Sequence, residues 1–129
     1  MERTLLGGTL DIDETLVDAS VDEIDRQIRE YERGERRAFD LEVAFPDSFT
    51  GRVMEVMAEI PFGETRTYGD IAADLETAPV AVGQAAGRNP VALVVPCHRV
   101  VGADSLGGYS AAGGVTLKEA LLTHEGVID

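Results

Sequence analysis

The chain has 129 residues, of which 44% are hydrophobic, enough for one domain with an ordinary core or for one domain with a small appendage. Its 24 acidic and 11 basic residues give a net charge of −13. A single cysteine excludes an internal disulfide and a multi-cysteine zinc site, which fits a reducing compartment. No stretch resembles a signal peptide or reaches membrane-spanning length, so we expect a cytoplasmic protein.

The acidic balance has two interpretations. An acidic surface repels nucleic acid and argues against DNA binding. Alternatively, a hydrated acidic surface keeps a protein soluble in molar intracellular salt, where charge repulsion is strongly screened. We favour this halophilic interpretation because the acidic residues avoid the segment from Asn89 to Val100 altogether.

Residues 1–45 predict a small helix/strand module. Residues 4–10 indicate a ragged strand. Ser20 and Glu23 have the spacing of a capping box at the start of an amphipathic helix. Residues 39–45 alternate between apolar and polar and predict a half-buried strand. Nothing in this module suggests chemistry.

Residues 46–129 predict a second, mostly helical domain. Thr50 is expected to cap a helix with a methionine-containing apolar face, and Thr67 is expected to cap the next helix. Residues 80–86 predict a helix with few large side chains, suited either to tight packing or to close approach to a nucleic-acid groove. Helix, turn, helix is by itself a weak indication of DNA binding. A final helix is expected from Thr116.

The only cysteine, Cys97, follows an aliphatic run and comes directly after Pro96. This arrangement predicts a buried segment that presents the cysteine at a rigid turn. For a lone cysteine, a small buried core residue is the alternative interpretation. The adjacent His98 and Arg99 favour the thiolate, which is the nucleophilic form.

Ordered motifs connect this cysteine with the rest of the chain: IPFGETRTYGDIA (60–72), AVGQA (81–85), NPVALVVPCHRV (89–100), GGYS (107–110) and HEG (124–126). Together they resemble the methylated-DNA–protein cysteine methyltransferases, also called O6-alkylguanine-DNA alkyltransferases. The resemblance covers roughly residues 38–129. It implies an α+β, mostly helical fold, with a reduced N-terminal module (1–45) and a winged-helix-like, helix-turn-helix catalytic domain (46–129).

The resemblance also implies an activity. The alkyl group of O6-alkylguanine, and of O4-alkylthymine, would move irreversibly to Cys97, so that each molecule acts once. The damaged nucleotide must first be flipped out of the duplex. His98 would be the base, acting through a water, Glu125 would orient and charge it, and Tyr68 would protonate the leaving guanine. The implied partner is double-stranded DNA, for a monomer without metal, nucleotide cofactor or membrane.

Residues around the substrate follow from the same resemblance. Asn89 would brace the turn that carries Cys97. Ser110 would bind O6 of the base, with Tyr109 beside it as the aromatic wall of the pocket. The backbone carbonyls of Cys97 and Val100 would read the exocyclic amine of guanine.

The expected DNA contacts are Val80, Ala81, Gly83, Gln84, Arg88 and Arg99. Of these, Arg99 is expected mainly to fix local structure and to add positive potential. Two features depart from the family pattern here. Val80 stands where an arginine usually fills the gap left by the flipped base, so we expect weaker flipping. Ala111 and Ala112 form an apparent insertion that could move the substrate loop. Scarce basic residues matter less in molar salt, where phosphate contacts contribute little.

Three other interpretations compete. A non-catalytic alkyltransferase-like protein would bind the lesion without repairing it, but such proteins replace the cysteine that this chain keeps. A winged-helix DNA-binding module would explain the helices but not Tyr68, Ser110 and Glu125 together. A cysteine hydrolase is disfavoured because the chain has no second histidine suited to catalysis.

Overall fold

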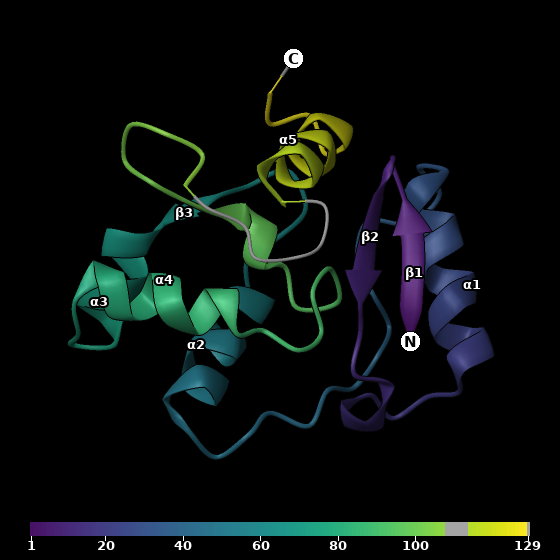
Figure 1. Cartoon of the computed structure of the whole chain (residues 1–129), viewed down its shortest axis with the longest axis horizontal. Helices are drawn as coiled ribbons and strands as arrows, with labels where there is room; N and C mark the ends of the chain where they lie inside the picture. Colours follow the sequence, from purple (N-terminus) through teal and green to yellow (C-terminus); the bar gives the residue numbers. More distant parts are fainter. Residues whose placement is uncertain (108–113, 129) are drawn as a thin grey trace.

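The computed structural model describes residues 1–107 and 114–128. The elements are β1 (Glu2–Leu5), β2 (Gly8–Asp11), η1 (Glu14–Leu16), α1 (Val21–Glu32), α2 (Phe49–Ala58), β3 (Arg66–Thr67), α3 (Tyr68–Asp74), α4 (Pro79–Gly87), η2 (Cys97–Arg99), β4 (Val100–Val101) and α5 (Gly114–His124). The β1–β2 hairpin and α1 lie side by side at one end of the molecule, α2, α3 and α4 gather at the other, and α5 lies above them (Figure 1). The predicted α+β, mostly helical fold is confirmed.

The N-terminal module begins with an antiparallel hairpin rather than one ragged strand. Its turn places Leu6 and Gly7 at φ 48° and 82°, the left-handed backbone that a tight hairpin needs. Ser20 caps α1 as predicted, because its side chain accepts a hydrogen bond from the amide of Glu23. The carboxylate of Glu23, however, binds Arg26 instead of closing a reciprocal box.

The strand predicted over residues 39–45 is not formed. The segment is extended, but its strand pairing is limited to one isolated bridge between Val43 and Val17. Three residues before Val43, the side-chain amide of Gln27 bonds both backbone groups of Asp40, at 3.1 and 2.8 Å, as a neighbouring strand would have done. Alternation predicted the half-buried face correctly, but it carries no information about whether a strand partner exists.

Helix α2 starts earlier than the sequence suggested, so the cap predicted at Thr50 is wrong. Ser48 is the cap, and its hydroxyl accepts a hydrogen bond from the Gly51 amide at 3.1 Å. Gly51 lies against the preceding loop so closely that an added Cβ would stand 1.7 Å from the carbonyl oxygen of Pro46. The chain can turn back onto α2 only because this residue has no side chain.

Helices α3 and α4 form the predicted helix-turn-helix. Thr67 and Asp70 close a complete capping box at the start of α3. Pro79 occupies the first turn of α4, where its missing N–H costs no hydrogen bond.

The segment before Cys97 is buried as predicted, and it consists of a series of turns, with Leu93 at φ 77°. After Cys97 the chain enters β4, which pairs in parallel with β3. The pairing ties the start of α3 to the exit of the Cys97 turn. Helix α5 begins at Gly114 rather than at Thr116. No helix within the described ranges is long and apolar enough to cross a membrane.

Candidate active site

Cys97 begins the short 3-10 turn η2 directly after Pro96, and 7% of its surface is exposed. Asn89 spans the turns before it: its side-chain amide donates to the carbonyl of Val95 at 2.9 Å, and its oxygen accepts from the amide of Val91 at 3.1 Å. The Asn89 side chain therefore ties Val91 to Val95 in the turns that precede Cys97.

Behind Cys97 lies a buried carboxylate with several donors. Oε2 of Glu125 accepts hydrogen bonds from Tyr31 Oη at 2.6 Å, His98 Nε2 at 2.8 Å and an Arg99 terminal nitrogen at 2.9 Å. Oε1 accepts from Arg99 Nε at 2.8 Å and, weakly, from the Gly63 amide at 3.4 Å. Burial alone would raise the pKa of Glu125, but its bonds with His98, Arg99 and Tyr31 together lower that pKa well below the ordinary value. Glu125 is therefore ionised.

The ionised carboxylate fixes the tautomer of His98. A carboxylate only accepts hydrogen bonds, so Nε2 of His98 must carry the proton that it shares with Glu125. Burial lowers the pKa of His98 and outweighs the opposing influence of Glu125, so the ring is neutral. Nδ1 is then an acceptor, and it is buried without a hydrogen-bond partner among the described residues. The ring is thus prepared to accept a proton through Nδ1.

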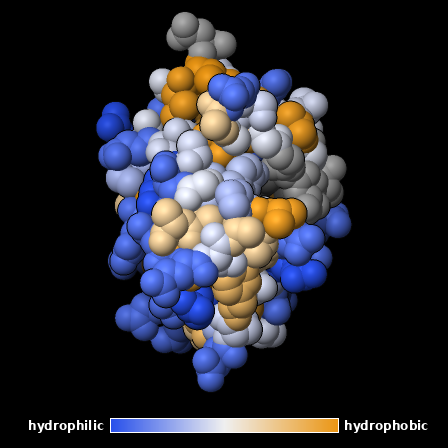
Figure 2. Space-filling view, turned by 90° about the vertical axis from the view of Figure 1, so that its left-hand side faces the viewer, coloured by the Kyte–Doolittle hydropathy of each residue, from blue (hydrophilic) through white to orange (hydrophobic). Residues whose placement is uncertain are grey.

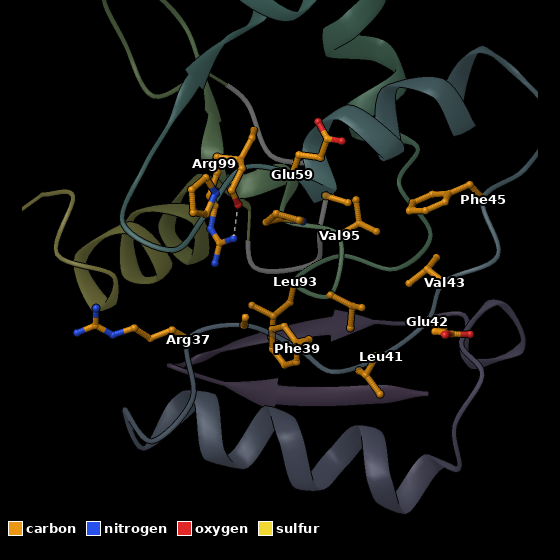
Figure 3. A pocket seen from close by; sticks show the side chains of 16 residues that line it. Arg37, Phe39, Leu41, Glu42, Val43, Phe45, Glu59, Leu93, Val95 and Arg99 are labelled. Carbon is orange, nitrogen blue, oxygen red and sulfur yellow. Dashed lines mark hydrogen bonds between the residues drawn. The ribbon is translucent and has the colours of Figure 1, made fainter.

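Arg99 is buried, and its guanidinium bonds other groups of the protein. Its guanidinium makes the bidentate pair with Glu125 and donates to the carbonyl of Ile60 at 2.7 Å, and only 6% of the residue is exposed. Figure 3 shows Arg99 among the residues around the cavity, with a dashed line marking its hydrogen bond. With its donors engaged inside the protein, Arg99 is not available as the predicted DNA contact.

A cavity of about 500 Å³ lies on the same side as Arg99 (Figure 3). Apolar side chains of the extended segment 39–45 face those of residues 93–96 across it. Cys97, Tyr68 and Lys118 do not line this cavity. The cavity is therefore separate from the face on which Tyr68 and Lys118 lie.

Tyr68, the first residue of α3, and Lys118, on α5, form the other flank of Cys97. Lys118 is fully buried and donates to the carbonyl of Val100 at 2.6 Å and to the Tyr68 hydroxyl at 3.4 Å. An added Cβ on Gly107 would stand 2.7 Å from that hydroxyl, so a residue without a side chain is needed there.

The charges on this flank suit a thiolate. Burial lowers the pKa of Lys118 to about 8, against the opposing effect of negative charge on Cys97, so the lysine is mostly protonated at neutral pH. Burial and that same charge raise the pKa of Tyr68, which keeps its phenol protonated. A buried ammonium and a proton donor thus lie near the sulfur.

Helix α4 presents an uncharged surface. Val80 is 68% exposed, Gln84 is exposed, and Ala81 and Gly83 are partly so, while no residue of α4 carries a charge. Figure 2, which views the molecule from the side of α3, shows a band of neutral and apolar atoms with hydrophilic atoms on both sides. Arg88, just beyond the helix, is exposed.

The structure adds little about the predicted substrate pocket. Tyr109, Ser110 and the Ala111–Ala112 insertion lie outside the described residues. The carbonyl of Val100 is already bonded by Lys118, and that of Cys97 by the Val100 amide. Within residues 1–107 and 114–128 no cluster of three or more His, Cys, Asp or Glu could hold a metal.

Sequence reasoning missed Tyr31 and Lys118. Tyr31 lies in a module whose sequence suggests no chemistry, yet its hydroxyl bonds Glu125. Lys118 lies near the start of the final helix, on the same buried stripe as Leu117, Leu121 and Leu122. A lysine at the spacing of an apolar stripe was the signal that could have found it.

The chain is similar to known proteins over most of its length. The family model described as "6-O-methylguanine DNA methyltransferase, DNA binding domain" matches residues 48–127. A methylated-DNA–protein-cysteine methyltransferase of Archaeoglobus fulgidus is 46% identical over 118 residues, covering 84% of this chain and 78% of that protein. A protein of the same name from Methanosarcina acetivorans is 48% identical over 109 residues, covering 81% and 68% respectively.

Solved structures give the same result. The O6-methylguanine methyltransferase of Mycobacterium tuberculosis is similar with a TM-score of 0.75 and 43% identity, over 82% of this chain and 66% of that one. The crystal structure of the M. tuberculosis protein in complex with DNA has a TM-score of 0.75 and 44% identity, over 81% and 66% of the two chains. This chain thus spans about two thirds of the solved M. tuberculosis chains.

Proposed function

This chain belongs to the methylated-DNA–protein-cysteine methyltransferase family, and on that basis we propose that it repairs O6-alkylguanine in duplex DNA by moving the alkyl group to its own Cys97. The observation that carries the proposal is the buried hydrogen bond of 2.8 Å between His98 and Glu125 beside the only cysteine. A nucleophile, an oriented base and the group that orients it are the parts that such a transfer needs.

Activation of the sulfur follows from the tautomer of His98. The neutral ring accepts the proton of Cys97 at Nδ1, through a water, and Glu125 stabilises the imidazolium that forms. The Lys118 ammonium adds a positive charge on the opposite flank. An unperturbed thiol is only a few per cent thiolate at neutral pH, so these groups supply most of the nucleophile.

Transfer then proceeds as a displacement at the alkyl carbon. The thiolate electron pair forms the new C–S bond while the C–O6 bond breaks and its electrons pass into the guanine ring. Tyr68, still protonated because its pKa is raised, donates its proton to the departing guanine. The hydrogen bond from Lys118 stabilises the phenolate left behind. The thioether on Cys97 is stable, so each molecule acts once.

Delivery of the base is assigned to α4. A base stacked in a duplex cannot reach Cys97, so the nucleotide is flipped out while the small residues Ala81 and Gly83 let the helix approach the minor groove. Gln84 and Arg88 contact the backbone, and exposed Val80 enters the gap as an apolar wedge. Valine cannot bond the orphaned base as an arginine would, which weakens flipping.

The substrate pocket is completed by residues outside the described part of the chain. Ser110 is assigned to O6 of the flipped base and Tyr109 to the pocket wall. The carbonyls of Cys97 and Val100 keep a second lone pair each with which to read the exocyclic amine. O4-alkylthymine presents the same alkyl–oxygen group and is included as a substrate.

Working conditions follow from the charge. With a net charge of −13 and no charge on α4, we assign the protein to a cytoplasm of molar salt, as a monomer with residues 1–45 and 46–129 as its two domains. DNA binding that makes few phosphate contacts loses little affinity as salt rises.

Intact mass tests the function. The protein is incubated with a duplex containing O6-methylguanine, at low and at molar salt, beside a duplex with plain guanine. We expect a stoichiometric gain of one methylene on Cys97, no gain with plain guanine and none in Cys97→Ala. If DNA binds but no adduct forms at either salt concentration, the chain is a non-catalytic lesion-binding protein instead.

A further inference from the structure

We propose that Tyr31, on α1 of the N-terminal module, is a positioning residue for the alkyl transfer: its hydroxyl holds Glu125 and so keeps His98 in the neutral form that accepts the proton of Cys97. The inference rests on the proposed function and deepens it. It gives residues 1–45, which otherwise carry no chemistry, a part in the reaction.

The contact is short, buried and distant in sequence. Tyr31 is fully buried, and its hydroxyl donates to Oε2 of Glu125 at 2.6 Å across 94 residues of chain. That same oxygen accepts the Nε2 proton of His98 at 2.8 Å. Tyr31 and His98 therefore share one acceptor atom, so the strength of one bond affects the other.

A second contact fixes the same two elements. Nε2 of His124 donates to the backbone carbonyl of Tyr31 at 2.7 Å, and the two rings lie 4.9 Å apart. The last turn of α1 thus holds two consecutive residues at the end of α5, one by its carbonyl and one by its hydroxyl. The rings of Phe39 and Phe62 pack on the Tyr31 ring, with centroid distances of 5.6 and 6.1 Å, and this packing fixes the orientation of the Tyr31 hydroxyl.

The charges around His98 show why a neutral donor matters. Glu125 favours the imidazolium, whereas Arg99 from the same turn and Lys118 from α5 disfavour it, and Cys97 adjoins it. Burial and the Glu125 charge raise the pKa of Tyr31, so its phenol remains a donor throughout the neutral range. By donating to Oε2, Tyr31 weakens the effect of the Glu125 charge on His98 and so lowers the proton affinity of the imidazole.

A purely structural role would need only the ring. Phenylalanine would fill nearly the same volume and keep the contacts with Phe39, Phe62 and His124. The hydroxyl adds a hydrogen bond to a charged group, worth roughly a factor of ten or more in an equilibrium. Removing it should therefore change the proton affinity of His98.

The test compares Tyr31→Phe with Ile28→Val. Ile28 lies three residues earlier on the buried face of α1, and its aliphatic side chain cannot hydrogen-bond Glu125, so Ile28→Val loosens packing without removing such a bond. Single-turnover methyl transfer is followed from pH 5.5 to 9, and the ring signals of the two histidines are titrated by nitrogen NMR in the same proteins.

We expect the acid limb of the rate profile to move to higher pH in Tyr31→Phe, with transfer slowed by up to about tenfold at pH values below the pKa of His98 and close to wild type above pH 8. The NMR titration of His98 should move in the same direction, and Ile28→Val should shift neither. Unchanged limbs and an unchanged His98 titration in Tyr31→Phe, or equal slowing in both variants at every pH, would overturn the proposal.

The NMR arm separates this proposal from the function. His98 can be titrated without any alkyl transfer. An inactive wild-type protein would therefore contradict the proposed function, while the effect of Tyr31→Phe on the His98 titration could still be measured. If Tyr31→Phe does not fold, the wild-type protein decides. The Tyr31 hydroxyl proton should appear as a slowly exchanging downfield signal with an Overhauser contact to His98. The absence of this signal would contradict the proposal.

Discussion

Cys97 lies between two unlike regions. On one side, which we call the relay side, Tyr31, His98, Arg99 and Glu125 are buried and their mutual hydrogen bonds measure 2.6 to 2.9 Å. On the other, the DNA-facing side, α4 carries no charge, Val80 is 68% exposed and the bond from Lys118 to Tyr68 is a long 3.4 Å.

The difference separates what is built during folding from what is completed by substrate. The desolvation of the relay side is compensated inside the protein, so its geometry is ready before DNA arrives. On the DNA-facing side, the proposed function has α4 and Tyr68 gain further contacts from the flipped base and the groove. Changes on the relay side should therefore damage stability and transfer together, whereas changes on the DNA-facing side should separate the two.

The largest effect should follow Glu125→Gln. The amide cannot neutralise the guanidinium of Arg99, and its N–H group faces other donors. We expect a loss of about 3–5 kcal/mol in the free energy of unfolding, measured with urea. Single-turnover transfer in the folded fraction should fall by about 100-fold or more. Glu119→Gln, an exposed change on the same helix, should alter neither value. A stable, active Glu125→Gln protein would show that the relay side does not depend on the Glu125 charge.

The relay side shows how far sequence reasoning reaches. Cys97, His98 and Glu125 belong to motifs with family spacing, so their proximity could be expected across 28 residues of chain. The cap at Ser20 was also predictable, because capping is a contact between residues three apart. Such features depend on local chemistry or on a shared motif.

Tyr31 and Lys118 could not be found in this way. A helical stripe predicts that a side chain is buried but not which atom it meets, and Tyr31 meets Glu125 from 94 residues away. The expected strand over 39–45 failed for a related reason, since strand formation depends on a neighbour that alternation does not specify. Likewise, Ser48 rather than Thr50 caps α2 because the close approach at Gly51 fixes where the helix starts.

On the DNA-facing side, Tyr68→Phe should separate transfer from stability. The ring still packs beside Gly83 and Gly107, so the urea midpoint should stay close to that of wild type. Without the phenol proton the guanine leaves as an anion, and transfer should slow by about 10- to 100-fold. Affinity for the lesion duplex, measured by fluorescence anisotropy, should be unchanged. An equal loss of stability and rate would place Tyr68 with the relay side.

Lys118→Met should reduce transfer and yet stabilise the protein. Its pKa falls from 10.5 when unfolded to about 8 when folded, so between these values the unfolded chain binds more protons and wild-type stability rises with pH. Relative to Lys118→Met, wild type should gain about 2 kcal/mol in unfolding free energy from pH 7.5 to 9.5. Transfer at pH 7 should fall about tenfold with the loss of the ammonium. A pH-independent difference between the two proteins would contradict a buried, titrating lysine.

The smallest effects should come from Val80, where Val80→Arg and Val80→Ala form a matched pair. The added guanidinium makes one more phosphate or base contact, so the slope of log affinity against log salt should steepen by about one. Affinity should rise a few-fold at low salt, and the gain should vanish at molar salt. Val80→Ala removes only apolar surface, so its loss of about three- to tenfold should be nearly the same at every salt concentration. If neither variant changes binding, α4 does not meet DNA through Val80. If Val80→Ala instead shows the steeper salt dependence, Val80 does not act through an apolar contact with DNA. The uncharged surface of α4 would then not explain how this side of the protein binds.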